Sequence, residues 1–244
     1  MTRAMILAAG EGTRLRPLTT TVPKPMLPLA DRPLLEHLLD LLRRHGVRDV
    51  AINLHHLPQV IPAYFGEGRR FGVRITYSYE ESLLGSAGAI KKLESFFDET
   101  FLVLYGDVLT DLDLTALRAF HSARGAALTM ALHQPPDLTR CGVAEIDPQG
   151  RLCRFREKPP PDEVCSPWAN AGIYVMEPAV QRFIPAGQPF DFAADLFPLL
   201  LERGLPVYGY PTDAHVLDIG SAERYRQAER DLAQRGALAT AQGG

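Results

Sequence analysis

The sequence predicts an α/β fold in which helices cover both faces of a mostly parallel sheet. Short apolar runs typical of buried strands, such as residues 5–9, 50–54 and 101–105, alternate with segments of helical periodicity in the first half of the chain. The composition agrees, because 46% of the residues are hydrophobic and 23% are charged, as in ordinary globular proteins. The length of 244 residues fits one to two domains.

The first half of the sequence predicts a glycine loop between its first strand and its first helix. The apolar run at residues 5–9 ends in Gly10-Glu11-Gly12, which breaks the strand. A helix begins at Pro33, presents leucines at 34, 35, 38, 39, 41 and 42, and ends at Gly46. The other predicted elements of this half are strands at 50–54, 73–77 and 101–105 and a helix at 87–96.

The second half is less regular. It predicts strands at 126–133 and 173–176, a helix at 190–203 that Pro198 caps or kinks, and a helix at 221–234. We expect one domain over residues 1–235, with a nucleotide-binding part at about 1–134 and a sugar-binding part at about 135–220. The remaining residues, 236–244, are expected to form a flexible tail.

Charge and composition exclude several classes of partner. The formal net charge of -3 argues against nucleic acid, whose binding proteins carry a basic surplus. No apolar run approaches the roughly 20 residues of a membrane helix, and the first ten residues do not form a signal peptide. The three cysteines, at 141, 153 and 165, lack CxxC spacing, which argues against zinc and fits reduced thiols in the cytoplasm.

The segment from Leu7 to Thr19, followed by Pro23-Lys24-Pro25, carries the first chemical signal. A glycine loop after a parallel strand lets backbone N–H groups approach phosphate oxygens. Leu15 replaces the last glycine of the dinucleotide pattern, and no Gly-Lys-Ser/Thr follows as in a P-loop. The loop is instead accompanied by two cations, Arg14 and Lys24.

This string resembles the G-x-G-T-R-L-x-P-L-T…P-K-P signature of the sugar-1-phosphate nucleotidylyltransferases, which make NDP-sugars. The resemblance implies a Rossmann-like three-layer fold with a mostly parallel mixed sheet, and it is greatest to members without a C-terminal β-helix. It places Arg14 on the triphosphate and Lys24 near the α-phosphate or the sugar phosphate. The nucleotide-binding residues that it implies in this segment are Leu7, Ala9, Gly10, Gly12 and Thr13.

Two aspartates are candidate metal ligands. Asp107 follows a buried strand, and the carboxyl end of such a strand faces the crevice where α/β sheets bind ligands. The plainer interpretation of Asp107 is a turn or a helix cap. Mg²⁺ takes one or two carboxylates together with phosphate oxygens. The resemblance makes Asp107 a catalytic Mg²⁺ ligand and Asp218, in a segment similar to D-I-G-T, the second ligand.

Three later segments resemble the sugar pocket of the same family. They are Cys141-Gly142-Val143, where the family has Y-G-V, and segments that match E-K-P and N-A-G-I-Y. A carboxylate can accept hydrogen bonds from sugar hydroxyls, and a lysine offsets phosphate charge. The sugar-phosphate-binding residues implied are Gly142, Glu157, Lys158, Asn170 and Gly172.

Residues 80–88 resemble the nucleobase segment of mannose-1-phosphate guanylyltransferase-like members. This implies base contacts from Glu80, Glu81, Gly85 and Gly88. Guanine offers two parallel donors that a carboxylate accepts, whereas uracil and thymine offer one donor between two acceptors. We therefore expect Glu80 or Glu81 to select guanine. The alternative is that both glutamates face water and that backbone atoms read the base.

The sequence thus predicts an enzyme that joins an NTP and a sugar 1-phosphate into an NDP-sugar and pyrophosphate, with Mg²⁺ as cofactor. GTP and mannose 1-phosphate are the expected pair. One alternative is a UTP- or dTTP-dependent enzyme for glucose or an N-acetylated sugar. Another is a non-catalytic nucleotide-sugar-binding regulatory subunit, which would be free to lose Arg14, Lys24 and Asp107. No nucleic-acid or membrane partner is expected, and a homo-oligomer stays open.

Overall fold

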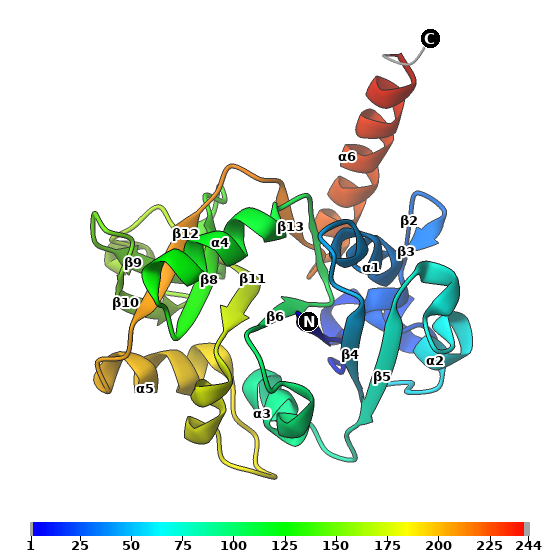
Figure 1. Ribbon diagram of the computed structural model, residues 1–244. Helices are drawn as coiled ribbons and strands as arrows, with labels where there is room; N and C mark the ends of the chain where they lie inside the picture. Colours follow the sequence, from blue (N-terminus) through cyan, green and yellow to red (C-terminus); the bar gives the residue numbers. More distant parts are fainter. Residues whose placement is uncertain (1, 242–244) are drawn as a thin grey trace.

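A mixed nine-stranded sheet forms the centre of the computed structural model, which describes residues 2–241 (Figure 1). The neighbouring strands β5, β4, β1 and β6 run parallel to one another. Strand β11 runs antiparallel to β6 on one side and to β8 on the other, and β12 lies parallel to β8. Of these seven strands, β11 is therefore the one with the opposite direction. The predicted α/β fold with a mostly parallel mixed sheet is confirmed.

The bounds of the strands in this sheet are β1 Arg3–Leu7, β4 Asp49–Leu54, β5 Arg74–Tyr79, β6 Phe101–Tyr105, β8 Leu128–His133, β9 Gly142–Ile146, β10 Leu152–Glu157, β11 Ala169–Met176 and β12 Val207–Pro211. Strands β9 and β10 form an antiparallel hairpin that joins β11 through the pair Val143 and Ala169. Two small antiparallel ribbons complete the strands: β2 Pro28–Leu29 with β3 Arg32–Pro33, and β7 Val108–Thr110 with β13 Val216–Asp218.

The alternation of side chains along β1 explains why helices cover both faces. Ala4 and Ile6 belong to one buried apolar cluster with most of the leucines of α1, whereas Met5 belongs to another with Ile90 of α3. A strand buried on both faces must read as a continuous apolar run, as this one does. The bounds of the helices are α1 Leu34–Arg44, α2 Val60–Phe65, α3 Gly85–Lys92, α4 Leu114–Arg124, α5 Phe197–Glu202 and α6 Ala222–Ala241.

Several predicted elements differ in detail from those observed. The helix expected at 190–203 is a π turn over Phe192–Leu196 followed by α5, which places Pro198 in the first turn, where no N–H is needed. Helix α6 continues through residues 236–241 and extends away from the sheet (Figure 1), while residues 242–244 lie outside the described residues. Within residues 2–241, no helix is sufficiently long and apolar to cross a membrane.

Candidate active site

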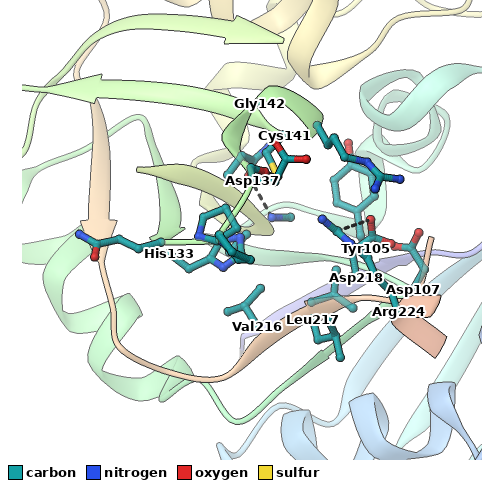
Figure 2. Close-up of a pocket in the computed structure, with 18 of the residues that line it drawn as sticks. Tyr105, Asp107, His133, Asp137, Cys141, Gly142, Val216, Leu217, Asp218 and Arg224 are labelled. Atoms are coloured by element: carbon teal, nitrogen blue, oxygen red, sulfur yellow. Dashed lines mark hydrogen bonds and ion pairs between the residues drawn. The ribbon is translucent and has the colours of Figure 1, made fainter. Parts of the chain in front are cut away.

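A cavity of about 970 Å³ opens beyond the carboxyl end of β6, between the first and second halves of the chain (Figure 2). Its wall combines residues from distant segments: Arg14 of the glycine loop, Tyr105 and Asp107 at the end of β6, and Arg224 of α6. The β9–β11 region and residues 212–218 complete the wall. This is the position where an open α/β sheet is expected to bind its ligands.

The ribbon of β7 and β13 brings Asp107 and Asp218 together. Asp218 pairs with Val108 in this ribbon, and the N–H of Ile219 donates to the carbonyl of Asp107 at 3.0 Å. The backbone itself therefore fixes the two carboxylates as neighbours, although they come from opposite halves of the chain.

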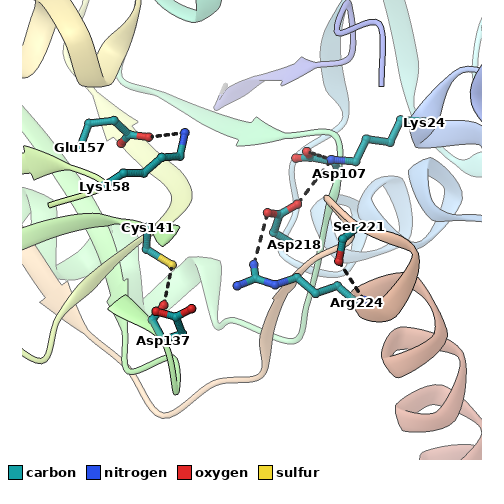
Figure 3. A network of polar contacts seen from close by, with 9 residues as sticks. All are labelled: Lys24, Asp107, Asp137, Cys141, Glu157, Lys158, Asp218, Ser221 and Arg224. Carbon is teal, nitrogen blue, oxygen red and sulfur yellow. Dashed lines mark hydrogen bonds and ion pairs between the residues drawn. The ribbon is translucent and has the colours of Figure 1, made fainter. Parts of the chain in front are cut away.

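Lys24 lies between these two carboxylates (Figure 3). Its side chain is 10% exposed, and its Nζ forms ion pairs with Asp107 and, at 3.4 Å, with Oδ1 of Asp218. A buried ammonium needs a counter-charge, and here two carboxylates share one ammonium. The predicted catalytic residues Lys24 and Asp107 thus meet in one cluster with Asp218, whose other oxygen, Oδ2, lies 3.4 Å from Nη1 of Arg224.

The two glycines of the glycine loop differ in what a side chain at each position would meet. Gly12 has a φ of +63°, and a Cβ there would lie 3.0 Å from Cγ2 of Thr19, whose hydroxyl donates to the Gly12 carbonyl at 2.8 Å. A Cβ on Gly10 would meet nothing within 4 Å, so Gly10 leaves open space beside the loop backbone. Arg14 is exposed and reaches the cavity wall, whereas Leu7, Ala9, Gly10, Gly12 and Thr13 do not line it.

All five residues predicted for the sugar phosphate line the cavity: Gly142, Glu157, Lys158, Asn170 and Gly172. Lys158 pairs with Glu157 at 3.0 Å, and a Cβ on Gly142 would lie 2.8 Å from Oε2 of that glutamate. Asn170 shapes a bulge of β11: its Oδ1 accepts from the Gly172 N–H at 2.9 Å, and its Nδ2 donates to Tyr174 at 2.8 Å.

Three of the four residues predicted to contact the base make close contacts within the protein. Glu80 is 5% exposed, and its Oε1 accepts from Nδ2 of Asn53 at 2.8 Å while its Oε2 accepts from the Leu84 N–H at 3.0 Å. A Cβ on Gly85 would lie 2.6 Å from the carbonyl oxygen of Phe190. A Cβ on Gly88 would likewise lie 2.9 Å from that of residue 188. These two glycines permit close backbone packing, and Glu81 is the exposed carboxylate of the segment.

The structure adds residues to the site that sequence reasoning missed. Burial raises the pKa of Tyr105 to about 12, so its hydroxyl stays protonated. Burial, aided by the charges of Arg224 and His215, lowers the pKa of His133 to about 4, which keeps this imidazole neutral. Burial also raises the pKa of the Cys141 thiol. The signal that could have pointed to Arg224 is its place six residues after Asp218, at the start of the helix predicted at 221–234.

A profile of the family described as nucleotidyl transferase matches residues 3–235. The chain belongs to the nucleotidyl transferase family. It is 44% identical over 247 residues to a UTP–glucose-1-phosphate uridylyltransferase of a Synechocystis strain, covering 96% of this chain and 64% of that protein. It is 37% identical over 234 residues to a mannose-1-phosphate guanylyltransferase of Mycobacterium tuberculosis, covering 94% and 64%.

A solved structure of UDP-glucose pyrophosphorylase with UDP-glucose shares the fold, with a TM-score of 0.84 at 22% identity and coverage of 96% and 99%. The profile match and the two relatives confirm the family membership predicted from the motifs. This nucleotidyl transferase chain spans 64% of the length of both curated relatives.

Proposed function

We propose that this chain transfers a nucleotidyl group from an NTP to a sugar 1-phosphate and releases pyrophosphate. The observation that carries the proposal is the cavity itself: Arg14, Asp107 and Asp218 line it together with all five residues predicted for the sugar phosphate. A site that must hold two phosphorylated substrates side by side needs this combination of cations, carboxylates and sugar-facing polar groups.

The chemistry asks mainly for positioning and charge neutralisation. The phosphate of a sugar 1-phosphate is largely a dianion at neutral pH, so its oxygen needs no general base. That oxygen forms a bond to the α-phosphorus, and the bond to the bridging oxygen of the β-phosphate breaks, so pyrophosphate leaves with the electron pair. Arg14 can hold phosphate oxygens bidentately, and Lys24 supplies a nearby point charge.

Asp107 and Asp218 form a donor set that fits Mg²⁺. Both carboxylates converge on the same ammonium, which shows that one positive centre can contact them together. The described part of the chain has no group of three or more His, Cys, Asp or Glu residues placed to hold a metal ion, so the two carboxylates would need phosphate or water oxygens as further ligands. Mg²⁺ characteristically binds in this way, and when bound it neutralises phosphate charge.

The identity of the base and of the sugar is a finer part of this proposal. The relative at 44% identity favours UTP with glucose 1-phosphate, whereas the resemblance of residues 80–88 favours GTP with mannose 1-phosphate. Because both oxygens of Glu80 accept internal hydrogen bonds, the guanine interpretation now depends on Glu81. We therefore put UTP with glucose 1-phosphate first and GTP with mannose 1-phosphate second.

The test is pyrophosphate release over a grid of four NTPs and several sugar 1-phosphates. Arg14→Ala should lower kcat/KM by about 10²–10³-fold with the preferred pair. Arg16→Ala is the matched control, because Arg16 is exposed and pairs with Glu11 at 3.9 Å outside the cavity. Pyrophosphate release from no pair, with nucleotide-sugar binding intact, would replace this proposal with the regulatory-subunit alternative.

A further inference from the structure

A second, smaller recess of about 220 Å³ adjoins the main cavity and is strongly cationic. Of the described residues that line it, four are basic and one is acidic: Arg14, Arg140, Lys158 and Arg224 against Asp218. The hydroxyl-bearing Thr139 and Ser221 and the backbone of Gly220 complete its wall. Lys158 is paired with Glu157 at 3.0 Å, so Asp218, which is also an ion-pair partner of Lys24, faces the other three cations of the recess.

The four cations come from four different segments. Arg14 follows the glycine loop, Arg140 precedes β9, Lys158 follows β10, and Arg224 lies in the first turn of α6. Figure 3 shows Lys158 on one side of the site and Arg224, beside Asp218, on the other. Like charges that line one recess repel one another, so an anion that enters the recess is attracted by these side chains. A phosphate dianion has the charge and the acceptor oxygens for this position.

We propose that this recess binds the phosphate group of the sugar 1-phosphate, and that Arg224 and Arg140 are binding residues for it. The proposal rests on the proposed function. The acceptor phosphate is favoured over the polyphosphate of the NTP because the β9–β10 region, which carries the predicted sugar residues Gly142 and Glu157, also contributes Arg140 and Lys158. The glycine loop contributes Arg14 alone.

Arg224 also pairs with Asp218, so a purely structural role must be told apart from substrate binding. An arginine that only positions Asp218 would affect kcat, because its loss would disturb the carboxylate cluster. An arginine that binds the acceptor phosphate would affect the KM of the sugar 1-phosphate, and the KM of the NTP would stay nearly constant.

The kinetic experiment uses Arg224→Gln, the conservative Arg224→Lys, and Arg226→Gln as a matched control. Arg226 is on the same helix but is exposed and lines neither cavity. We expect Arg224→Gln to raise the KM of the sugar 1-phosphate by about 10–100-fold, as for a lost charged hydrogen bond, with the KM of the NTP within threefold. Arg224→Lys should recover part of the loss, and Arg226→Gln should behave as wild type. A rise in the NTP KM alone, or a fall in kcat at constant KM, would overturn the proposal.

A binding experiment without NTP separates this proposal from the proposed function. Isothermal titration calorimetry with glucose 1-phosphate and with inorganic phosphate requires no turnover. Both compounds should bind the wild type. Their affinity for Arg224→Gln should be lower by about tenfold or more, while Arg226→Gln keeps the wild-type affinity. Equal affinity in all three proteins, or no binding of either compound to the wild type, would overturn the recess as a phosphate site even if pyrophosphate release is observed.

Discussion

Replacing Glu80 by glutamine decides whether this carboxylate supports the fold or reads the base. Glu80 ends a chain of buried hydrogen bonds that begins at the Ala8 N–H, which donates to Oδ1 of Asn53 at 2.7 Å. Nδ2 of Asn53 then donates to Oε1 of Glu80, and the Leu84 N–H donates to Oε2. Both oxygens of Glu80 must accept, which only a carboxylate can do.

A glutamine in this position has one acceptor and one donor group. If its NH₂ faces Leu84, it meets an N–H; if it faces Asn53, that amide can turn only by presenting its own NH₂ to the Ala8 N–H. Every orientation therefore leaves buried donors facing each other. An unsatisfied buried donor costs about 1–3 kcal/mol, and the loss of a charged acceptor adds to it, so we expect a loss of about 2–3 kcal/mol. For a chain of this size, that lowers the Tm by roughly 4–12 °C.

The assay combines thermal unfolding with the ratio of kcat/KM values for GTP and UTP. We expect Glu80→Gln to lower the Tm and leave the GTP/UTP ratio within threefold. Glu81→Gln is the control, since Glu81 is exposed and should keep the wild-type Tm within about 1 °C. A wild-type Tm for Glu80→Gln together with a tenfold change in the base ratio would refute the internal role and restore Glu80 as a base-reading residue.

Three further predictions concern the site and its support. Asp107→Asn should lower the kcat of pyrophosphate release by about 10²–10³-fold. The Tm should change by only a few degrees, because Asp107 is a partly exposed carboxylate at a strand end. A wild-type rate at limiting Mg²⁺ would contradict its role as a metal ligand. Gly85→Ala should cost about 1–3 kcal/mol in urea unfolding, since φ is +72° and the new Cβ would lie 2.6 Å from the Phe190 carbonyl; an unchanged midpoint would refute this. In the folded protein the pKa of His133 is about 4, below the ordinary value of 6.5, so between these pH values the unfolded chain binds more protons than the folded one. The free energy of unfolding therefore decreases as the pH falls through this window, by at most about 3 kcal/mol. His133→Gln should flatten that part of the stability curve measured by urea unfolding, and an unchanged slope would speak against the lowered pKa.

The parallel half of the sheet could be predicted because its strands are buried on both faces. The run from Met5 to Ala9 and the run from Phe101 to Tyr105 need no partner to be recognised, since burial on both faces makes every position apolar. The three-residue strands β7 and β13 could not be found in this way. They are too short to show periodicity, and they form because they pair with each other across the chain.

The residues that share the cavity wall could be predicted where a motif fixes both residue type and local backbone. The sequence predicts one sugar pocket for the Glu157-Lys158 and Asn170 segments, and the structure places both in the wall of one cavity. The contacts of Glu80 could not be predicted, because sequence position shows that a carboxylate is near a turn but not which donors it meets. One donor to Glu80 is Asn53 of β4, which lies 27 residues earlier in the chain, and no local pattern connects the two residues.

The backbone at Lys158 argues for a role of its side chain in binding. Lys158 has a φ of +47°, in the left-handed region that favours glycine, and a residue with a Cβ is destabilised there by about 1–2 kcal/mol. Its N–H is held by the carbonyl of Cys141 at 3.0 Å, and Pro159 follows it. A glycine would satisfy this backbone at lower cost, but it would remove the ammonium that lines both the main cavity and the cationic recess. We therefore infer that this backbone conformation serves to place that charge where a phosphate would enter the site.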